Sequence, residues 1–333
     1  MKVEIVFILI LVLSFLMTSC SLKWLIPVLK SKKMGQKILE IGPRWHKGKE
    51  GTPTMGGLSF IFAVIACFLL FLFISKNVVD KKLLTCSINI IVYGILNAMI
   101  GIIDDFAKIR NARNEGLTPS GKFFLQSIAA ILFLISLKYT VGITTILYIP
   151  FFDVFLKLGF FYYVLAFLLL CGVVNSVNLT DGLDGLAAGV SLSVGIFFAI
   201  VSLLVTREIT VAFFASVIIG SMLGFLVYNF YPARVFMGDT GSLFLGAIIV
   251  ASAFLIDNIL LVLVYGFVFV CEALSVIMQV AYFKATKGKR LFKMAPLHHH
   301  FEKSGYSEVK ITMLFTLVNA IFCLLACFGM GIL

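Results

Sequence analysis

The sequence is poor in charged residues. Asp, Glu, Lys and Arg make up only 13% of its 333 residues, whereas an ordinary soluble domain contains about 25%. Hydrophobic residues reach 61%, so little of the chain remains outside long apolar runs. This composition excludes an ordinary soluble domain and leaves no room for a separate soluble catalytic domain, and it indicates a chain that lies in a bilayer.

The seven cysteines lack the spacing of a metal or disulfide site. They are scattered through apolar stretches, without the paired spacings of a zinc site or a secreted disulfide framework. The first apolar segment also lacks an Ala-x-Ala-like cleavage site, so we expect residues 3–22 to remain as a helix rather than a removed signal peptide. Internal repeats and linkers are missing as well, which predicts one integral membrane domain over residues 1–333.

Ten apolar runs are the main organising feature of the chain. The runs 123–137 and 243–256 are short and need flanking residues to cross about 30 Å of hydrocarbon. The sequence therefore predicts an all-α polytopic membrane protein with about ten transmembrane helices. The expected spans are residues 3–22, 57–74, 83–103, 123–137, 159–174, 186–205, 209–227, 243–256, 259–282 and 309–333.

Basic residues are divided unevenly between the two sets of connections. Nineteen of the 27 Lys and Arg residues fall in the connections that follow the odd-numbered runs, and seven fall on the other side. Since short cytoplasmic loops carry the basic excess, the first set is predicted to face the cytoplasm and both termini to lie outside. On the outer side, residues 138–157 suggest a small hairpin.

Polar residues near the membrane segments gather in the same set of connections. Such groups are costly at a membrane segment unless they face water or a partner, so they indicate a functional site. A transporter would more often place them near the bilayer midplane, and this pattern favours a site at one membrane face. The residues are Asp104, Asp105, Asn175, Asn178, Asp181, Asp184, Asn229, Asp239, His298, His299 and His300.

Asp104 and Asp105 follow the third run directly. The negative end of a helix dipole disfavours carboxylates, so this pair favours a cation site over a solvated helix end, and hard divalent ions take oxygen ligands. Asp239 offers a further carboxylate beside two glycines at a helix start, although it could merely cap that helix. Phe236, nearby, could stack on a flat base.

Two further segments carry dense polar groups. Residues 175–185 (NSVNLTDGLDG) contain more amides and acids than a turn requires and could hydrogen-bond a polar ring. Residues 296–302 (PLHHHFE) hold three of the four histidines in a row, which favours phosphate contact or proton transfer over a zinc site. Glu272 and Gln279 share one face of the ninth run, and their role is open.

Five segments in order resemble the phospho-N-acetylmuramoyl-pentapeptide transferases. The resemblance implies a multi-pass enzyme of the bacterial inner membrane that forms lipid I and UMP from UDP-N-acetylmuramoyl-pentapeptide and undecaprenyl phosphate. It also implies Mg²⁺, a homodimer and an active site facing the cytoplasm, and no nucleic-acid partner is expected. The segments are residues 51–57 (GTPTMGG), 104–108 (DDFAK), 175–185 (NSVNLTDGLDG), 236–242 (FMGDTGS) and 295–302 (APLHHHFE).

The resemblance also implies roles for single residues. Asp104 matches the proposed base or nucleophile, and Asp105 matches its acidic partner. Asp239 matches the magnesium ligand, and His298 matches the leading residue of the histidine motif. The expected substrate-binding residues are Lys49, Thr54, Lys108, Asn175, Asp181, Leu183, Asp184, Asn229, Phe236 and His299.

One position departs from the family pattern, and two other functions stay open. The family commonly has a lysine four residues after Lys108, where this chain has Ala112 between Arg110 and Arg113. Which cation replaces that lysine is open. A polyprenyl-phosphate N-acetylglucosamine-1-phosphate transferase would use the same chemistry on another sugar, and a transporter or lipid flippase would fit the composition alone.

Overall fold

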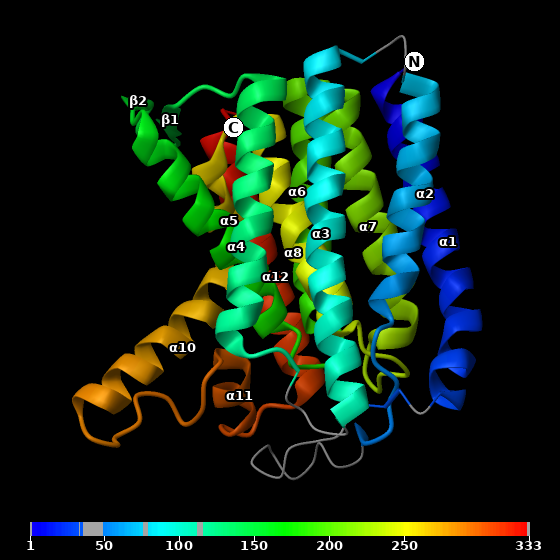
Figure 1. The fold of residues 1–333 in the computed structure, drawn as a ribbon, viewed down its shortest axis with the longest axis vertical. Coiled ribbons are helices and arrows are strands. Elements are labelled where there is room, and N and C mark those ends of the chain that lie inside the picture. The colour runs from blue at the N-terminus through cyan, green and yellow to red at the C-terminus, as the bar shows by residue number, and fades with distance from the viewer. Residues whose placement is uncertain (1, 33, 36–48, 76–78, 112–115, 332–333) are drawn as a thin grey trace.

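The computed structural model describes residues 2–32, 34–35, 49–75, 79–111 and 116–331. Within these ranges ten helices are long and apolar enough to cross a membrane, which confirms the predicted number. Figure 1 shows most of them side by side in one bundle. The main helices are α1 (Val3–Ser31), α2 (Gly57–Ser75), α3 (Lys81–Asn111), α4 (Pro119–Ser136), α5 (Phe160–Thr180), α6 (Leu186–Ile200), α7 (Ile209–Asn229), α8 (Gly238–Ala251), α10 (Phe267–Ala285) and α12 (Glu308–Gly329).

Flanking residues lengthen the short runs, as expected. The Thr118 side chain accepts a hydrogen bond from the Gly121 N–H at the start of α4, and a π-helical turn, η2 (Leu137–Val141), continues that helix. A 3₁₀ turn, η4 (Ser252–Ile256), extends α8 in the same way. Another π-helical turn, η3 (Val201–Thr206), follows α6. Each extended segment is thereby long enough to cross the hydrocarbon layer.

The ninth run, expected as one helix over residues 259–282, is divided. A short 3₁₀ turn, η5 (Ile259–Leu261), and α9 (Val262–Tyr265) precede a break at Gly266, after which α10 begins. Asn319 of α12 fills the break: its Oδ1 accepts from the Val268 N–H at 3.1 Å, and its Nδ2 donates to the Tyr265 carbonyl at 2.9 Å. A side chain from another helix thus satisfies the backbone groups that the break frees, which apolar periodicity could not reveal.

The centre of the bundle is α8, which packs between α3 and α5. Close glycine contacts fix its first turn. A Cβ on Gly57 would lie 2.2 Å from Gly241 Cα, and one on Gly101 would lie 2.3 Å from the Asp239 carbonyl oxygen. The starts of α2 and α8 and the last part of α3 therefore meet at one end of the molecule. In contrast, α10 leaves the bundle obliquely (Figure 1), and only four of its residues are buried.

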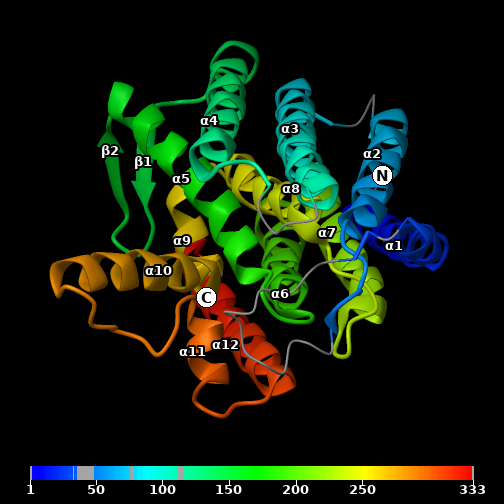
Figure 2. The same ribbon diagram turned by 60° about the horizontal axis from the view of Figure 1, so that its bottom comes forward.

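The two ends of the bundle differ. Strands β1 (Ile146–Ile149) and β2 (Val154–Lys157) form an antiparallel hairpin in which Ile146 pairs with Lys157, so the expected hairpin is confirmed. At the same end α1 begins and α12 ends (Figure 1). The opposite end carries α11 (Leu297–Glu302) and the connection from α10 to α12, which Figure 2 brings toward the viewer.

Candidate functional site

Three carboxylates converge where α3 approaches the first turn of α8. Ligand oxygens of Asp104, Asp105 and Asp239 lie within 4.8 Å of one another. The expectation that α3 ends near residue 103 is wrong, because the helix continues to Asn111. Asp104 and Asp105 therefore lie inside the helix and are buried. An all-oxygen donor set of this kind fits Mg²⁺, which uses few carboxylates and keeps places for water and phosphate.

The chain makes a sharp turn into α8 at Gly238. Its φ is +69°, a conformation that favours glycine. A Cβ there would lie 2.6 Å from Asp105 Oδ2 and 2.7 Å from Thr54 Oγ1. The expected site residue Thr54 thus comes close to the carboxylate cluster, and glycine is required for that approach.

Asp105 caps the start of α8 from a neighbouring helix. Its Oδ1 accepts from the Asp239 N–H at 3.2 Å, and its Oδ2 accepts from the Thr240 N–H at 2.9 Å and the Thr240 hydroxyl at 2.7 Å. A carboxylate at a helix N-terminus satisfies free N–H groups and interacts favourably with the helix dipole. Asp105 therefore fixes the position of Asp239 relative to Asp104.

Two lysines neutralise part of this charge. Lys108 Nζ lies 2.7 Å from Asp104 Oδ2 and 2.8 Å from Asp239 Oδ2. Lys122 Nζ lies 2.6 Å from the same oxygen of Asp239. Asn178 Nδ2 donates to Asp239 Oδ1 at 2.8 Å, so both oxygens of that carboxylate are bound.

Lys122 was not among the expected site residues, although the sequence carries a signal for it. It lies in the first turn of α4, where the positive end of the helix dipole disfavours a cation. The same helix-dipole argument indicated a cation site at Asp104 and Asp105. Ala112, where the family lysine is missing, lies outside the described residues, and Lys122 is a second described lysine at the cluster.

A second ion-pair cluster holds the turn between α5 and α6. Lys49 Nζ lies 2.6 Å from Asp184 Oδ1 and also pairs with Glu308. Glu308 in turn accepts from the Asp184 N–H at 2.6 Å, and Asp184 Oδ2 accepts from the Ala233 N–H at 2.8 Å. Two expected residues, Lys49 and Asp184, are thus brought together. Glu308 was missed because an acid in the first turn of a helix is ordinary.

Two expected amides tie elements of the site together. Asn229 Oδ1 accepts from the Gly185 N–H at 3.0 Å, and its Nδ2 donates to the Val235 carbonyl at 2.9 Å. Asn175 Nδ2 donates to Gln126 Oε1 at 2.7 Å, which joins α5 to α4. These contacts give both amides a structural task.

The segment around Phe236 pairs with the chain before α2. The Phe236 N–H donates to the Pro53 carbonyl at 2.9 Å, and the Gly56 N–H donates to the Phe236 carbonyl at 2.8 Å. Phe236 keeps partial exposure, whereas Leu183 is buried in the turn between α5 and α6. Phe236 thus keeps part of its surface exposed, whereas the Leu183 side chain packs inside the protein.

The three consecutive histidines have different partners. His298 is buried, with Nδ1 3.1 Å from Glu272 Oε2. His299 Nδ1 lies 2.7 Å from Glu302 Oε2, and His300 Nδ1 accepts from the Lys293 N–H at 3.1 Å. A common zinc site of the three is therefore not formed.

Asp181 connects the clusters electrostatically. It follows the last residue of α5, and burial raises the pKa of its carboxyl well above its ordinary value. The charges of Asp239, Asp105 and Asp184 raise this pKa further. Asp181 is therefore influenced by the acids of both clusters, and its carboxyl takes up a proton at a higher pH than a solvated carboxyl.

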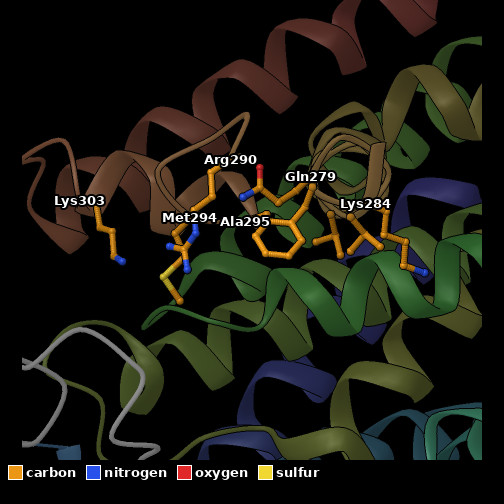
Figure 3. A pocket seen from close by; sticks show the side chains of 9 residues that line it. Gln279, Lys284, Arg290, Met294, Ala295 and Lys303 are labelled. Carbon is orange, nitrogen blue, oxygen red and sulfur yellow. The ribbon is translucent and has the colours of Figure 1, made fainter. Parts of the chain in front are cut away.

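A cavity of about 380 Å³ lies beside the histidine segment. Figure 3 shows the α10 side chains facing the connection to α11 across it, with Gln279 reaching toward that connection. Basic and apolar groups share the lining. The residues labelled there are Gln279, Lys284, Arg290, Met294, Ala295 and Lys303.

Sequence comparison places the chain among known transferases. The profile of glycosyl transferase family 4 matches residues 87–257, and the phospho-N-acetylmuramoyl-pentapeptide-transferase signature 1 matches residues 49–61. The phospho-N-acetylmuramoyl-pentapeptide-transferase of Halalkalibacterium halodurans is 43% identical over 97% of each chain. The enzyme of Oceanobacillus iheyensis is 42% identical over 95% of each chain. The enzyme of Clostridium acetobutylicum is 44% identical over 94% of this chain and 96% of the relative. This chain belongs to the phospho-N-acetylmuramoyl-pentapeptide-transferase family.

Proposed function

We propose that this protein transfers phospho-N-acetylmuramoyl-pentapeptide from UDP to undecaprenyl phosphate, forming lipid I and UMP for peptidoglycan synthesis. The observation that supports this most strongly is the convergence of Asp104, Asp105 and Asp239 with two lysines at one end of the bundle. The reaction joins two anions, so charge repulsion and positioning dominate its barrier. A site of cations and carboxylates at a membrane surface can offset this charge repulsion and position the two substrates.

The proposed cofactor is Mg²⁺, held by Asp239 beside Asp104 and Asp105. When bound, the ion supplies positive charge to the diphosphate. Lys108 and Lys122 contribute further positive charge beside the same carboxylates. Asp105 supports Asp239 by capping α8, and Asp104 is the proposed base or nucleophile.

The nucleotide is proposed to bind at the turn between α5 and α6. Asp184, Leu183 and Phe236 form the proposed uracil set, with Lys49 already paired to Asp184. His298 faces the same turn, because a Cβ on Gly182 would lie 2.3 Å from its Nε2. Thr54, Asn175, Asp181, Asn229 and His299 complete the proposed contacts.

We further propose one catalytic domain over residues 1–333, a homodimer, and a location in the bacterial inner membrane. The site would face the cytoplasm and both termini would lie outside. Support comes from the basic excess in the connections at the site end. An acceptor in the bilayer and a donor in the cytoplasm could then meet at one membrane face.

The activity can be tested with purified protein in detergent. UMP release should require UDP-N-acetylmuramoyl-pentapeptide, undecaprenyl phosphate and Mg²⁺ together. UDP-N-acetylglucosamine in place of the donor should give little UMP, and efficient turnover with it would favour the other sugar transferase. Asp104→Asn should bind the donor without transferring it. Absence of UMP release with every donor would contradict the proposed function.

A further inference from the structure

Glu272 is a buried carboxylate on a helix that is otherwise largely exposed. It lies on α10 with none of its surface exposed. A buried carboxylate without partners is strongly unfavourable, so its contacts indicate why it is there. Both of its oxygens contact one residue: Oε1 accepts from the His298 N–H at 3.2 Å, and Oε2 lies 3.1 Å from His298 Nδ1.

These contacts bear on the protonation of one ring nitrogen. With Glu272 ionised, the carboxylate only accepts hydrogen bonds, so Nδ1 of His298 carries the proton that it shares with Glu272. The carboxylate also holds the backbone of the same residue, so the ring has little freedom to rotate. Nε2 is then the ring nitrogen left for another molecule.

The described residues give Nε2 no hydrogen-bond partner, although it is buried. A buried polar atom of this kind needs an explanation, and a bound ligand is one. The atom faces the turn between α5 and α6, since a Cβ at Gly182 would lie 2.3 Å from it. The same turn carries Asp181 and Asp184.

A second α10 side chain fixes the chain that leads to His298. Gln279 lies seven residues after Glu272, on the same helix face. Its Oε1 accepts from the Leu291 N–H at 3.0 Å and the Phe292 N–H at 2.9 Å. Figure 3 shows Gln279 reaching from α10 toward this connection. One face of α10 thus holds the histidine segment at two points.

The geometry points to Glu272 as the positioning residue of His298, which keeps Nδ1 protonated and presents Nε2 to the nucleoside diphosphate donor. This inference rests on the proposed function for the identity of the ligand. The geometry of the His298 ring without substrate does not depend on the proposed function. Neutral His298 would accept a hydrogen bond through Nε2, and the protonated ring would donate one to a phosphate oxygen.

Glu272→Gln is the sharpest variant because it keeps the shape of the side chain. The His298 N–H still needs an acceptor, so it should take the Gln carbonyl and leave the Gln NH₂ group facing Nδ1. Nδ1 must then accept, and the proton of a neutral ring moves to Nε2. Glu4→Gln makes the same chemical change at an exposed ion pair with Arg207 and serves as the matched control.

Nitrogen NMR of ¹⁵N-histidine-labelled protein without substrates tests the ring directly, with His298→Ala giving the assignment. We expect protonated Nδ1 in the unaltered protein and in Glu4→Gln, and protonated Nε2 with bare Nδ1 in Glu272→Gln. A bare Nδ1 in the unaltered protein would overturn the inference. So would an unchanged His298 spectrum in a folded Glu272→Gln protein.

Kinetics separate positioning from general stability. Glu272→Gln should lower kcat by about 10- to 100-fold, as is typical when an outer partner that orients an imidazole is lost, with KM for the donor changed less. Adding Glu272→Gln to His298→Ala should cause no further loss, because the two residues act as a unit. Additive losses would contradict positioning. If no variant or unaltered protein releases UMP, the proposed function fails while the NMR result still decides the inference.

Discussion

At the residue scale, Asp239 is the proposed magnesium ligand of the carboxylate cluster. It pairs with Lys108 and Lys122 and accepts a hydrogen bond from Asn178. We expect Asp239→Asn to lower turnover by at least about 10²-fold and to weaken the dependence on Mg²⁺, because an amide is a poor ligand for a hard cation. UMP release across a magnesium titration measures both effects. Near-normal activity would remove Asp239 from the metal site.

Lys122 is a residue that the structure adds to the carboxylate cluster. Lys122→Met keeps much of the side-chain length but removes one of the two cations beside Asp239. We expect kcat to fall by about 10²-fold, which is typical when one preorganised charge-stabilising group is lost. Lys82→Met, at an exposed position near the start of α3, is the control. Equal activity of the two variants would mean that the Lys122 ion pair supports the fold and contributes nothing to turnover.

Asp181 should make stability depend on pH. Its folded-state pKa is raised above the unfolded value of about 3.9, so the carboxyl stabilises the fold below that pH and loses this contribution as pH rises through the folded pKa. Asp181→Asn cannot titrate, so its Tm relative to the unaltered protein should increase from pH 4 to pH 8. Thermal unfolding in detergent with a chelator measures this. A constant difference would contradict it, and exposed Asp153→Asn controls for loss of charge.

At the element scale, the break between α9 and α10 depends on one amide. Asn319→Leu would leave the Val268 N–H without its partner, while the Tyr265 carbonyl would keep the Cys323 Sγ donor at 3.4 Å. We expect the free energy of unfolding to fall by about 1–3 kcal/mol, the cost of one buried unsatisfied group. Thermal unfolding tests this against Leu317→Ala, an exposed change on the same helix. Equal stabilities would show that the break holds without Asn319.

The predicted helices differ in how closely their ends agree with the structure. The run 209–227 agrees with α7 to within two residues at its end. Errors arose where polar residues continue a helix, as in α3, or where a distant side chain supports a break, as at Gly266. Apolar periodicity reports contact with lipid or core, and it does not report hydrogen bonds made across the bundle.

At the scale of the whole molecule, the orientation in the membrane can be tested by labelling. Phe152 in the hairpin and Lys289 after α10 lie in connections at opposite ends and are exposed. We expect Phe152→Cys to react with an impermeant maleimide in intact cells and Lys289→Cys to react only after permeabilisation, because the basic connections should face the cytoplasm. The unaltered chain, with its seven cysteines, measures background. The reverse pattern would place the site outside.

The amino-acid sequence alone indicates a helical membrane protein, because it has few charges and its apolar runs of about 20 residues suit helices, which satisfy their own backbone polar groups. It also marked Asp104, Asp105 and Asp239 as residues of one site. Their separate contacts became visible in the folded protein. Asp105 caps α8, Lys122 joins Asp239, and Glu272 holds His298, and each contact joins residues far apart in the sequence. Such pairings follow from helix packing, which local sequence patterns do not encode.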